Sequence, residues 1–366
     1  MNKRNEGIDL LRCLAMLMVL VLHLFNHGGV NRALTQGSTG YNLAYLIYTL
    51  CFCSVNCYAL ISGYVGVTAR HRWRNILQHW LVAVFYAVLL ALVMPVIRPD
   101  VARRPLIAAF FPVIHRYYWY FTAYFALFFL MPLLNKGVKA MTRAEARRLV
   151  LSILAVFSGL STLPYINLLN SFATEDIFLL GNGLSMLWLM VMYIVGACVK
   201  VHDLGKSISA WKLAAGFAAS VLAAWCFKLV VEQDVPLPTR DLLDTNTLRY
   251  YQSPAMVIAS LCLLLLFSRR QTLPTIPGRI VRFIAPSAFS VYLIHEHSMV
   301  RSGLISGRFS TLAADAPLVM VGKGLLCAVL IYMVCILLDL ARRMLFRLLH
   351  VRQGIDWAAD RLHSAG

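Results

Sequence analysis

The chain has 366 residues, of which 60% are hydrophobic and only 14% are charged. A soluble domain has roughly 45–50% apolar and about 25% charged residues, so this composition excludes a soluble enzyme and a disordered chain. The formal net charge is +18. The basic residues lie between apolar runs, where they orient a membrane protein rather than form the surface of a nucleic-acid-binding domain.

Ten apolar stretches follow one another along the chain, and most are close to the ~20 residues that an α-helix needs to cross a bilayer. The sequence therefore predicts an all-α polytopic bundle of about ten transmembrane helices. In chain order, the predicted spans cover residues 8–26, 43–67, 76–97, 117–134, 149–163, 184–200, 208–231, 250–268, 281–300 and 318–340.

Lysine and arginine concentrate in alternate loops between these spans. Positively charged loops remain in the cytoplasm, so we expect both termini to be cytoplasmic. An even number of spans agrees with this, because it places both termini on the same side. We divide the chain into a transmembrane domain over residues 1–340 and a basic amphipathic cytoplasmic tail over residues 341–366. The arginines and leucines of this tail suit a helix that lies on the anionic inner leaflet.

The first span carries polar residues that a bilayer should exclude. His23 follows Arg12 by eleven residues, which on a helix is about 20° beyond three full turns, and Asp9 lies about 60° from Arg12. Ionisable groups in membrane helices usually face the bundle interior and mark a functional site. We interpret His23 as a proton acceptor and Asp9 as the ion-pair support of Arg12. The alternative is that Asp9 and Arg12 reach the membrane interface and His23 is a hydrogen-bonded core residue.

Two further clusters have two interpretations each. Arg70, Arg72 and Arg74 lie between the second and third spans, where they are either a topology signal or a clamp for cytoplasmic phosphates. His295 and Glu296 lie near the outer end of the ninth span, where they either serve function or hydrogen bond at the interface.

Metal binding is not expected from the sequence. His295 and His297 are two residues apart, about 200° around a helix, so they cannot share an ion on that element. The cysteines form no C-x-x-C pair. Trp119 belongs to an aromatic cluster of the kind that is common at membrane interfaces.

Several short motifs, taken in order, resemble acyltransferase family 3, the integral membrane O-acyltransferases that modify cell-envelope sugars. The resemblance is particularly to the bacterial polysaccharide O-acetyltransferase branch. The first span has the family's arrangement of an arginine, ten residues and a histidine, here Arg12 and His23. The other matching segments are residues 61–64, 118–124, 132–135, 193–197, 251–254 and 290–295, together with Trp188.

The resemblance implies transfer of an acyl group, most often acetyl from acetyl-coenzyme A, to a hydroxyl of a cell-envelope sugar or polysaccharide. It gives His23 the catalytic role and makes Arg12 essential. It also implies an arginine pair spaced R-x-x-R after the second helix. Arg70, Arg72 and Arg74 are spaced by two instead, so all three remain candidates for donor binding.

The implied partners are acetyl-coenzyme A as donor substrate, a lipid-linked sugar or polysaccharide as acceptor, and the lipids of a bacterial inner membrane. No bound cofactor and no nucleic acid are expected. The donor's phosphates would meet the arginines from the cytoplasm, and the acceptor would reach His23 from the outer side past Trp119, His295 and Glu296. One alternative is a sugar or lipid transporter or flippase, whose helices would be broken at mid-membrane. Another is a non-catalytic membrane subunit.

Overall fold

The structure is a computed structural model that describes residues 4–102, 105–165, 176–232 and 243–364, and within these residues it contains helices and turns but no strand. Seven helical stretches of the described chain are long and apolar enough to cross a membrane, and the all-α polytopic bundle is confirmed. These stretches are Glu6–Ala33, Thr39–Gly66, Trp73–Ile97, Trp119–Ala140, Arg143–Tyr165, Ala210–Glu232 and Pro317–Leu348.

Every predicted span coincides with one helix or with several consecutive helices. The longer helices are α1 (Glu6–Asn26), α3 (Thr39–Cys51), α4 (Ser54–Gly66), α5 (Trp73–Ile97), α7 (Trp119–Ala140), α8 (Arg143–Leu154), α9 (Met186–His202), α10 (Ala210–Glu232), α11 (Pro254–Ser268), α12 (Thr275–Ile284), α13 (Ala288–His295), α15 (Pro317–Leu348) and α16 (Val351–Ser364). The short helices are α2 (Val30–Ala33), α6 (Leu106–Phe110) and α14 (Ser298–Val300).

Local sequence explains where several helices begin. The side chain of Asn5 accepts a hydrogen bond from the backbone of Ile8 at the start of α1, and Ser38 and Ser185 cap α3 and α9 in the same way. Ser253 caps α11, whose first residue is Pro254. A proline is tolerated there because the first turn of a helix leaves its N–H groups without intrahelical partners.

Three predicted spans are not continuous α-helices. The span at 149–163 passes from α8 into a π-helix over Ala155–Leu160. The span at 43–67 is divided into α3 and α4 at Phe52 and Cys53. In the span at 281–300, α12 gives way to a 3₁₀ turn over Ala285–Ser287 before α13 begins. Pro286 lies in this turn and has no N–H to continue an α-helix.

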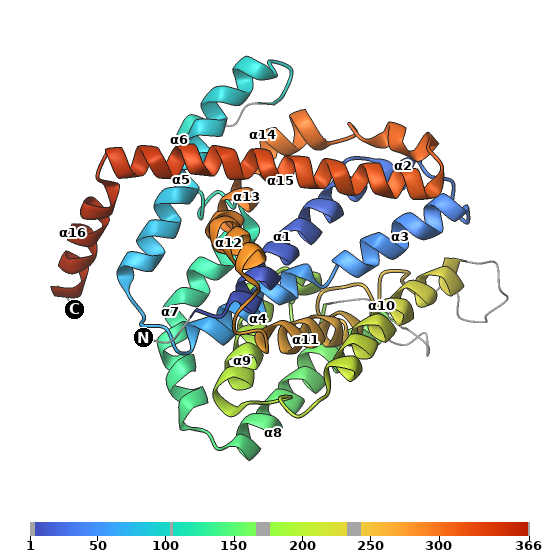
Figure 1. Ribbon diagram of the computed structural model, residues 1–366, viewed down its shortest axis with the longest axis horizontal. Helices are drawn as coiled ribbons and strands as arrows, with labels where there is room; N and C mark the ends of the chain where they lie inside the picture. The colour runs from blue at the N-terminus through green and yellow to red at the C-terminus, as the bar shows by residue number, and fades with distance from the viewer. Residues whose placement is uncertain (1–3, 103–104, 166–175, 233–242, 365–366) are drawn as a thin grey trace.

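The last span extends beyond its predicted end. α15 continues without a break through residue 340 to Leu348, and only then does α16 turn away toward the start of α5 (Figure 1). The predicted tail therefore consists of the last turns of α15 and a separate helix. Residues 1–3 and 365–366, which belong to the two predicted segments, lie outside the described residues.

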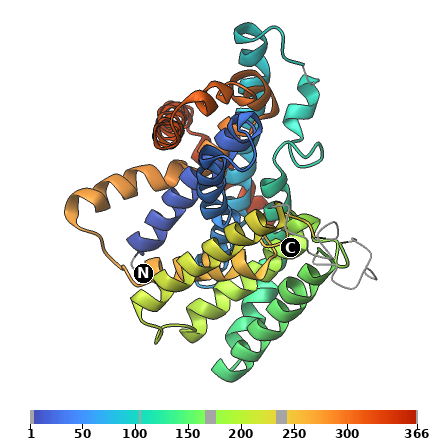
Figure 2. The ribbon, with the colours of Figure 1, turned by 90° about the vertical axis from the view of Figure 1, so that its right-hand side faces the viewer.

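Helix α1 occupies the centre of the bundle. It contacts α3, α4, α11, α12, α13 and α15, and Figure 2, which views α15 nearly end-on, shows it inside the bundle. Two thirds of its apolar window is buried, against a third for α15. A polar side chain on α1 therefore meets protein on most sides rather than lipid.

Helices α4 and α9 cross with their backbones almost in contact. A Cβ atom added to Gly63 would lie 1.9 Å from the carbonyl oxygen of Tyr193, and one added to Gly196 would lie 2.1 Å from that of Leu60. Small residues at such crossings let membrane helices approach closely, where dispersion forces hold them together.

We expect Gly63→Ala to destabilise the protein by about 1–3 kcal/mol, because the added methyl group overlaps a backbone that cannot move away cheaply. Thermal unfolding in detergent measures this effect. Gly137→Ala in α7 is the matched control, since nothing lies within 4 Å of the added atom. Equal unfolding temperatures for Gly63→Ala and the wild type would contradict the close crossing.

Candidate active site

A cavity of about 470 Å³ lies inside the bundle. Four residues singled out in the sequence line it, namely Arg12, His23, Arg70 and Trp119. Arg12 and His23 both come from α1, so their helical spacing does place them on one side of that helix, as the sequence predicts. The 3₁₀ turn between α12 and α13 contributes another part of the wall.

The His23 imidazole contacts two residues at the end of α13. Its Nδ1 lies 3.0 Å from Nε2 of His295 and 2.9 Å from Oε2 of Glu296. His295 places its other nitrogen, Nδ1, 2.6 Å from the carbonyl oxygen of Val291. A carbonyl only accepts hydrogen bonds, so neutral His295 carries its proton on Nδ1 and offers Nε2 as an acceptor.

These contacts assign the tautomer of His23. Both neighbours of its Nδ1, the Nε2 of His295 and the carboxylate of Glu296, are acceptors, so Nδ1 must carry the proton. The lone pair of neutral His23 is then on Nε2. An imidazole held in this way is a proton acceptor whose orientation is fixed by its neighbours.

Glu296 lies between two cationic or potentially cationic groups. Its Oε2 contacts His23, and its Oε1 accepts a hydrogen bond from Arg301. The carboxylate can therefore stabilise the positive charge that develops when His23 accepts a proton. The sequence analysis placed His295 and Glu296 along the acceptor path. The structure brings both against His23, and Arg301 was not anticipated.

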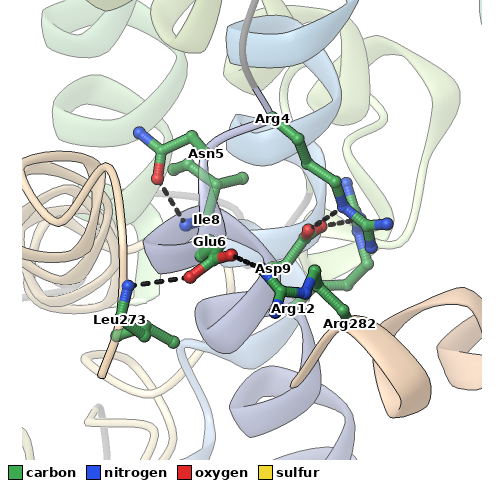
Figure 3. A network of polar contacts seen from close by, with 8 residues as sticks. All are labelled: Arg4, Asn5, Glu6, Ile8, Asp9, Arg12, Leu273 and Arg282. Carbon is green, nitrogen blue, oxygen red and sulfur yellow. Dashed lines mark hydrogen bonds and ion pairs between the residues drawn. The ribbon is translucent and has the colours of Figure 1, made fainter. Parts of the chain in front are cut away.

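Arg12 forms the ion pair that the sequence predicts. Its Nη1 lies 2.7 Å from Oδ1 of Asp9, and Arg4 pairs with the other carboxylate oxygen (Figure 3). The hydroxyl of Tyr58 on α4 donates to the carbonyl oxygen of Arg12 at 2.8 Å. Arg12 also lines the cavity, and its side chain is 28% exposed.

A second polar contact fixes the start of α1. Glu6 accepts hydrogen bonds from Arg282 on α12 and, at 2.8 Å, from the backbone of Leu273 (Figure 3). A buried carboxylate needs such partners, because isolated charges are costly to remove from water. The N-terminal end of α1 is thereby joined to the segment that leads into the 3₁₀ turn.

The structure separates the three clustered arginines. Arg70 lines the cavity together with His71. Arg72 is the residue immediately before α5, and Arg74 pairs at 3.0 Å with Asp356 on α16. Arg70 alone among the three is therefore a wall residue of the cavity.

One wall of the cavity depends on a buried carboxylate of α15. Asp339 is fully buried and accepts hydrogen bonds from Tyr86 at 3.0 Å and from Ser287 at 2.8 Å. It also pairs with Arg342 and Arg343. Ser287 belongs to the 3₁₀ turn whose other residues line the cavity, so Asp339 fixes the position of that turn.

Several other cavity residues were not singled out in the sequence. Tyr58 and His79 are examples. His79 is an ionisable residue inside a predicted span, and the rule that such residues are functional would have identified it. Tyr58 gives no comparable signal, because a tyrosine in an apolar stretch is common.

His23, His295 and Glu296 each offer one metal-ligand atom, and these atoms lie within 4.8 Å of one another. No metal site was predicted from the sequence, because His295 and His297 cannot share an ion on one helix. The contact between α1 and α13 assembles a different set from two elements. The two contacts of His23 Nδ1, at 3.0 and 2.9 Å, have hydrogen-bond lengths, so this geometry accommodates either a proton-transfer group or an ion.

A family model described as an acyltransferase domain matches residues 5–339, which include every cavity residue named above. No curated protein and no solved structure matches the chain significantly. The matched region begins just before α1 and ends within α15. With most of its length matched, and with its long apolar helices, the chain belongs to acyltransferase family 3 and is a membrane acyltransferase.

Proposed function

We propose that this membrane acyltransferase transfers an acetyl group from acetyl-coenzyme A to a hydroxyl of a cell-envelope sugar or polysaccharide in a bacterial inner membrane. His23 acts as the general base. The observation that carries the proposal is the His23 imidazole, supported by Glu296, on the wall of a cavity that also contains Arg12 and Arg70.

The charged end of the cavity suits the donor. Coenzyme A carries phosphates, and guanidinium groups bind phosphates through charge-assisted hydrogen bonds. Arg12 and Arg70 lie toward the predicted cytoplasmic side, where this donor is found. Eleven residues of α1 separate Arg12 from His23, a rise on the order of 16 Å. An extended thioester bound through its phosphates can therefore point toward the imidazole.

The reaction needs one proton acceptor and later one proton donor. Nε2 of His23 takes the proton of the sugar hydroxyl while the hydroxyl oxygen attacks the thioester carbonyl carbon. The carbon–sulfur bond breaks, and the imidazolium returns the proton to the coenzyme A thiolate. Glu296 stabilises the imidazolium between these two steps. The products are the acetylated sugar and free coenzyme A.

The transporter alternative has to compete with the acyltransferase family match, and the observation on its side is the interruption of a span by the 3₁₀ turn at Ala285–Ser287. Envelope glycan from cells with and without the gene separates the two functions. Loss of acetyl groups from a glycan that still reaches the surface indicates acyl transfer. Loss of the glycan itself from the surface indicates transport.

We expect His23→Ala to lower kcat by about 10²–10⁴-fold, because the variant lacks the group that accepts the hydroxyl proton. Glu296→Gln should lower kcat less, since it removes only the charge that supports the imidazolium. His115→Ala, at an exposed position, is the matched control. Acetyl transfer is measured with the purified, folded variants, and full activity of His23→Ala would exclude the general-base role.

Arg70→Glu should raise the KM for acetyl-coenzyme A by roughly tenfold or more and leave the KM for the acceptor nearly unchanged, because it replaces a phosphate-binding charge in the cavity. Arg72→Glu changes the net charge equally but lies outside the cavity wall, so it serves as the control. If the two variants raise the donor KM equally, the loop acts through its overall charge alone.

Chelation distinguishes a proton-transfer group from a metal ion at the histidine and glutamate cluster. We expect 1,10-phenanthroline to leave acetyl transfer unchanged, because His23 already has its partners among His295 and Glu296. Acetyl transfer is measured without the chelator, with the chelator, and again after the chelator is replaced by Zn²⁺. Loss of activity that Zn²⁺ then restores would show that the three residues bind a metal.

A further inference from the structure

A row of aromatic rings follows one face of α3 and ends at the cavity. Tyr41, Tyr45, Tyr48 and Phe52 recur every three or four residues, so they lie above one another along the helix. Successive ring centroids are 4.5, 6.0 and 5.4 Å apart. Phe52 then stacks on Tyr251 at 4.8 Å, and Tyr251 lines the cavity.

Two cations lie over this aromatic row. Nζ of Lys228 is 3.8 Å from the ring centroid of Tyr45, and its charge is paired with Glu232 on the next turn of α10. The guanidinium of Arg249 is 5.1 Å from the same ring and 5.7 Å from that of Tyr48. The row is therefore bordered by polar groups along part of its length.

Two of the nearby polar side chains have buried atoms without partners, although Nη2 of Arg249 donates a hydrogen bond to Asn246. Nε and Nη1 of Arg249, and both amide atoms of Gln252, have no hydrogen-bond partner among the described residues. Arg249 is 4% exposed and Gln252 is 1% exposed. Leaving buried donors and acceptors unpaired is unfavourable, so these groups are positioned for a molecule that is not part of the chain.

We propose that this site, defined as Tyr45, Tyr48, Arg249 and Gln252, binds a sugar unit of the acceptor. The proposal rests on the proposed function and identifies the residues that hold its second substrate. A pyranose has an apolar C–H face that packs on the electron-rich faces of aromatic rings. It also has hydroxyls that hydrogen bond to Arg249 and Gln252. Such a mixture of rings and a few convergent polar groups is typical of ligand sites.

The position of the site agrees with the direction from which an acceptor would arrive. α3 starts after the outer end of α1 in the predicted topology, and the row leads inward through Phe52 and Tyr251 to the cavity of His23. A lipid acyl chain would pack on the rings but would leave the donors of Arg249 unpaired. A sugar can pack on the rings and also accept hydrogen bonds from Arg249.

The experiment measures binding without catalysis. The probe is end-labelled envelope glycan purified from cells that lack the gene, titrated with the full-length protein in detergent and without acetyl-coenzyme A. We expect Arg249→Met and Tyr45→Leu each to weaken binding by about tenfold or more. Arg279→Met, the same substitution at an exposed arginine of α12, is the matched control and should bind normally.

Thermal unfolding separates binding from a structural role. Arg249→Met should unfold near the wild-type temperature, because the loss of its hydrogen bond to Asn246 is offset by the removal of a buried charge with two unpaired donors. A lower unfolding temperature, or unchanged glycan affinity for Arg249→Met and Tyr45→Leu, overturns the proposal. Absence of wild-type binding overturns it as well.

The two proposals fail in different ways. If the wild type acetylates the glycan when acetyl-coenzyme A is added, but Arg249→Met binds and reacts normally, the sugar site is wrong and the proposed function stands. If the glycan binds in an Arg249-dependent manner but is never acetylated, the sugar site stands and the proposed function is wrong.

Discussion

Ionisable side chains on a buried membrane helix must find their partners inside the protein, because lipid offers none. α1 meets this constraint at both of its ends with one segment of the chain. Near its N-terminal end Glu6 binds Arg282, and near its C-terminal end His23 contacts His295 and Glu296. The segment from α12 to α13 is thereby held at two points along α1. The 3₁₀ turn lies between these points and forms part of the cavity wall.

The same constraint distributes charge along the cavity. Asp9 is shared by Arg4 and Arg12, so this group remains net positive where Arg12 meets the cavity. The charge of Arg74 is neutralised by Asp356, and Arg74 does not line the cavity. The positive charge near Arg12, apart from the His23 imidazole, results from which cations are paired, and not simply from how many arginines the loop contains.

Sequence reasoning succeeded where one helix determines the geometry. The shared direction of Arg12 and His23 follows from the helical repeat, and the pairing of Arg12 with Asp9 follows from their three-residue separation. It failed where two elements meet. Nothing in positions 295 and 296 indicates contact with position 23, since that contact depends on how α13 packs against α1.

Hydropathy likewise predicted that apolar segments exist but not whether their helices are continuous. The interruption at Phe52 and Cys53 has no proline or glycine to indicate it, because an apolar run has the same hydropathy whether or not its backbone is broken. α15 continues past its predicted end at residue 340. Hydropathy ends the span at the first arginines, but arginine side chains can extend toward the interface while their backbone remains helical.

The break between α3 and α4 connects the two halves of the proposed reaction path. Before it, α3 carries the aromatic row; after it, α4 carries Tyr58, which holds the backbone of Arg12. At the break, Phe52 and Cys53 keep right-handed helical backbone angles, so the chain leads directly from α3 into α4. Phe52 stacks there on the cavity residue Tyr251. On the proposed function, one interrupted span thus contributes both to the entry of the sugar and to the binding of the donor.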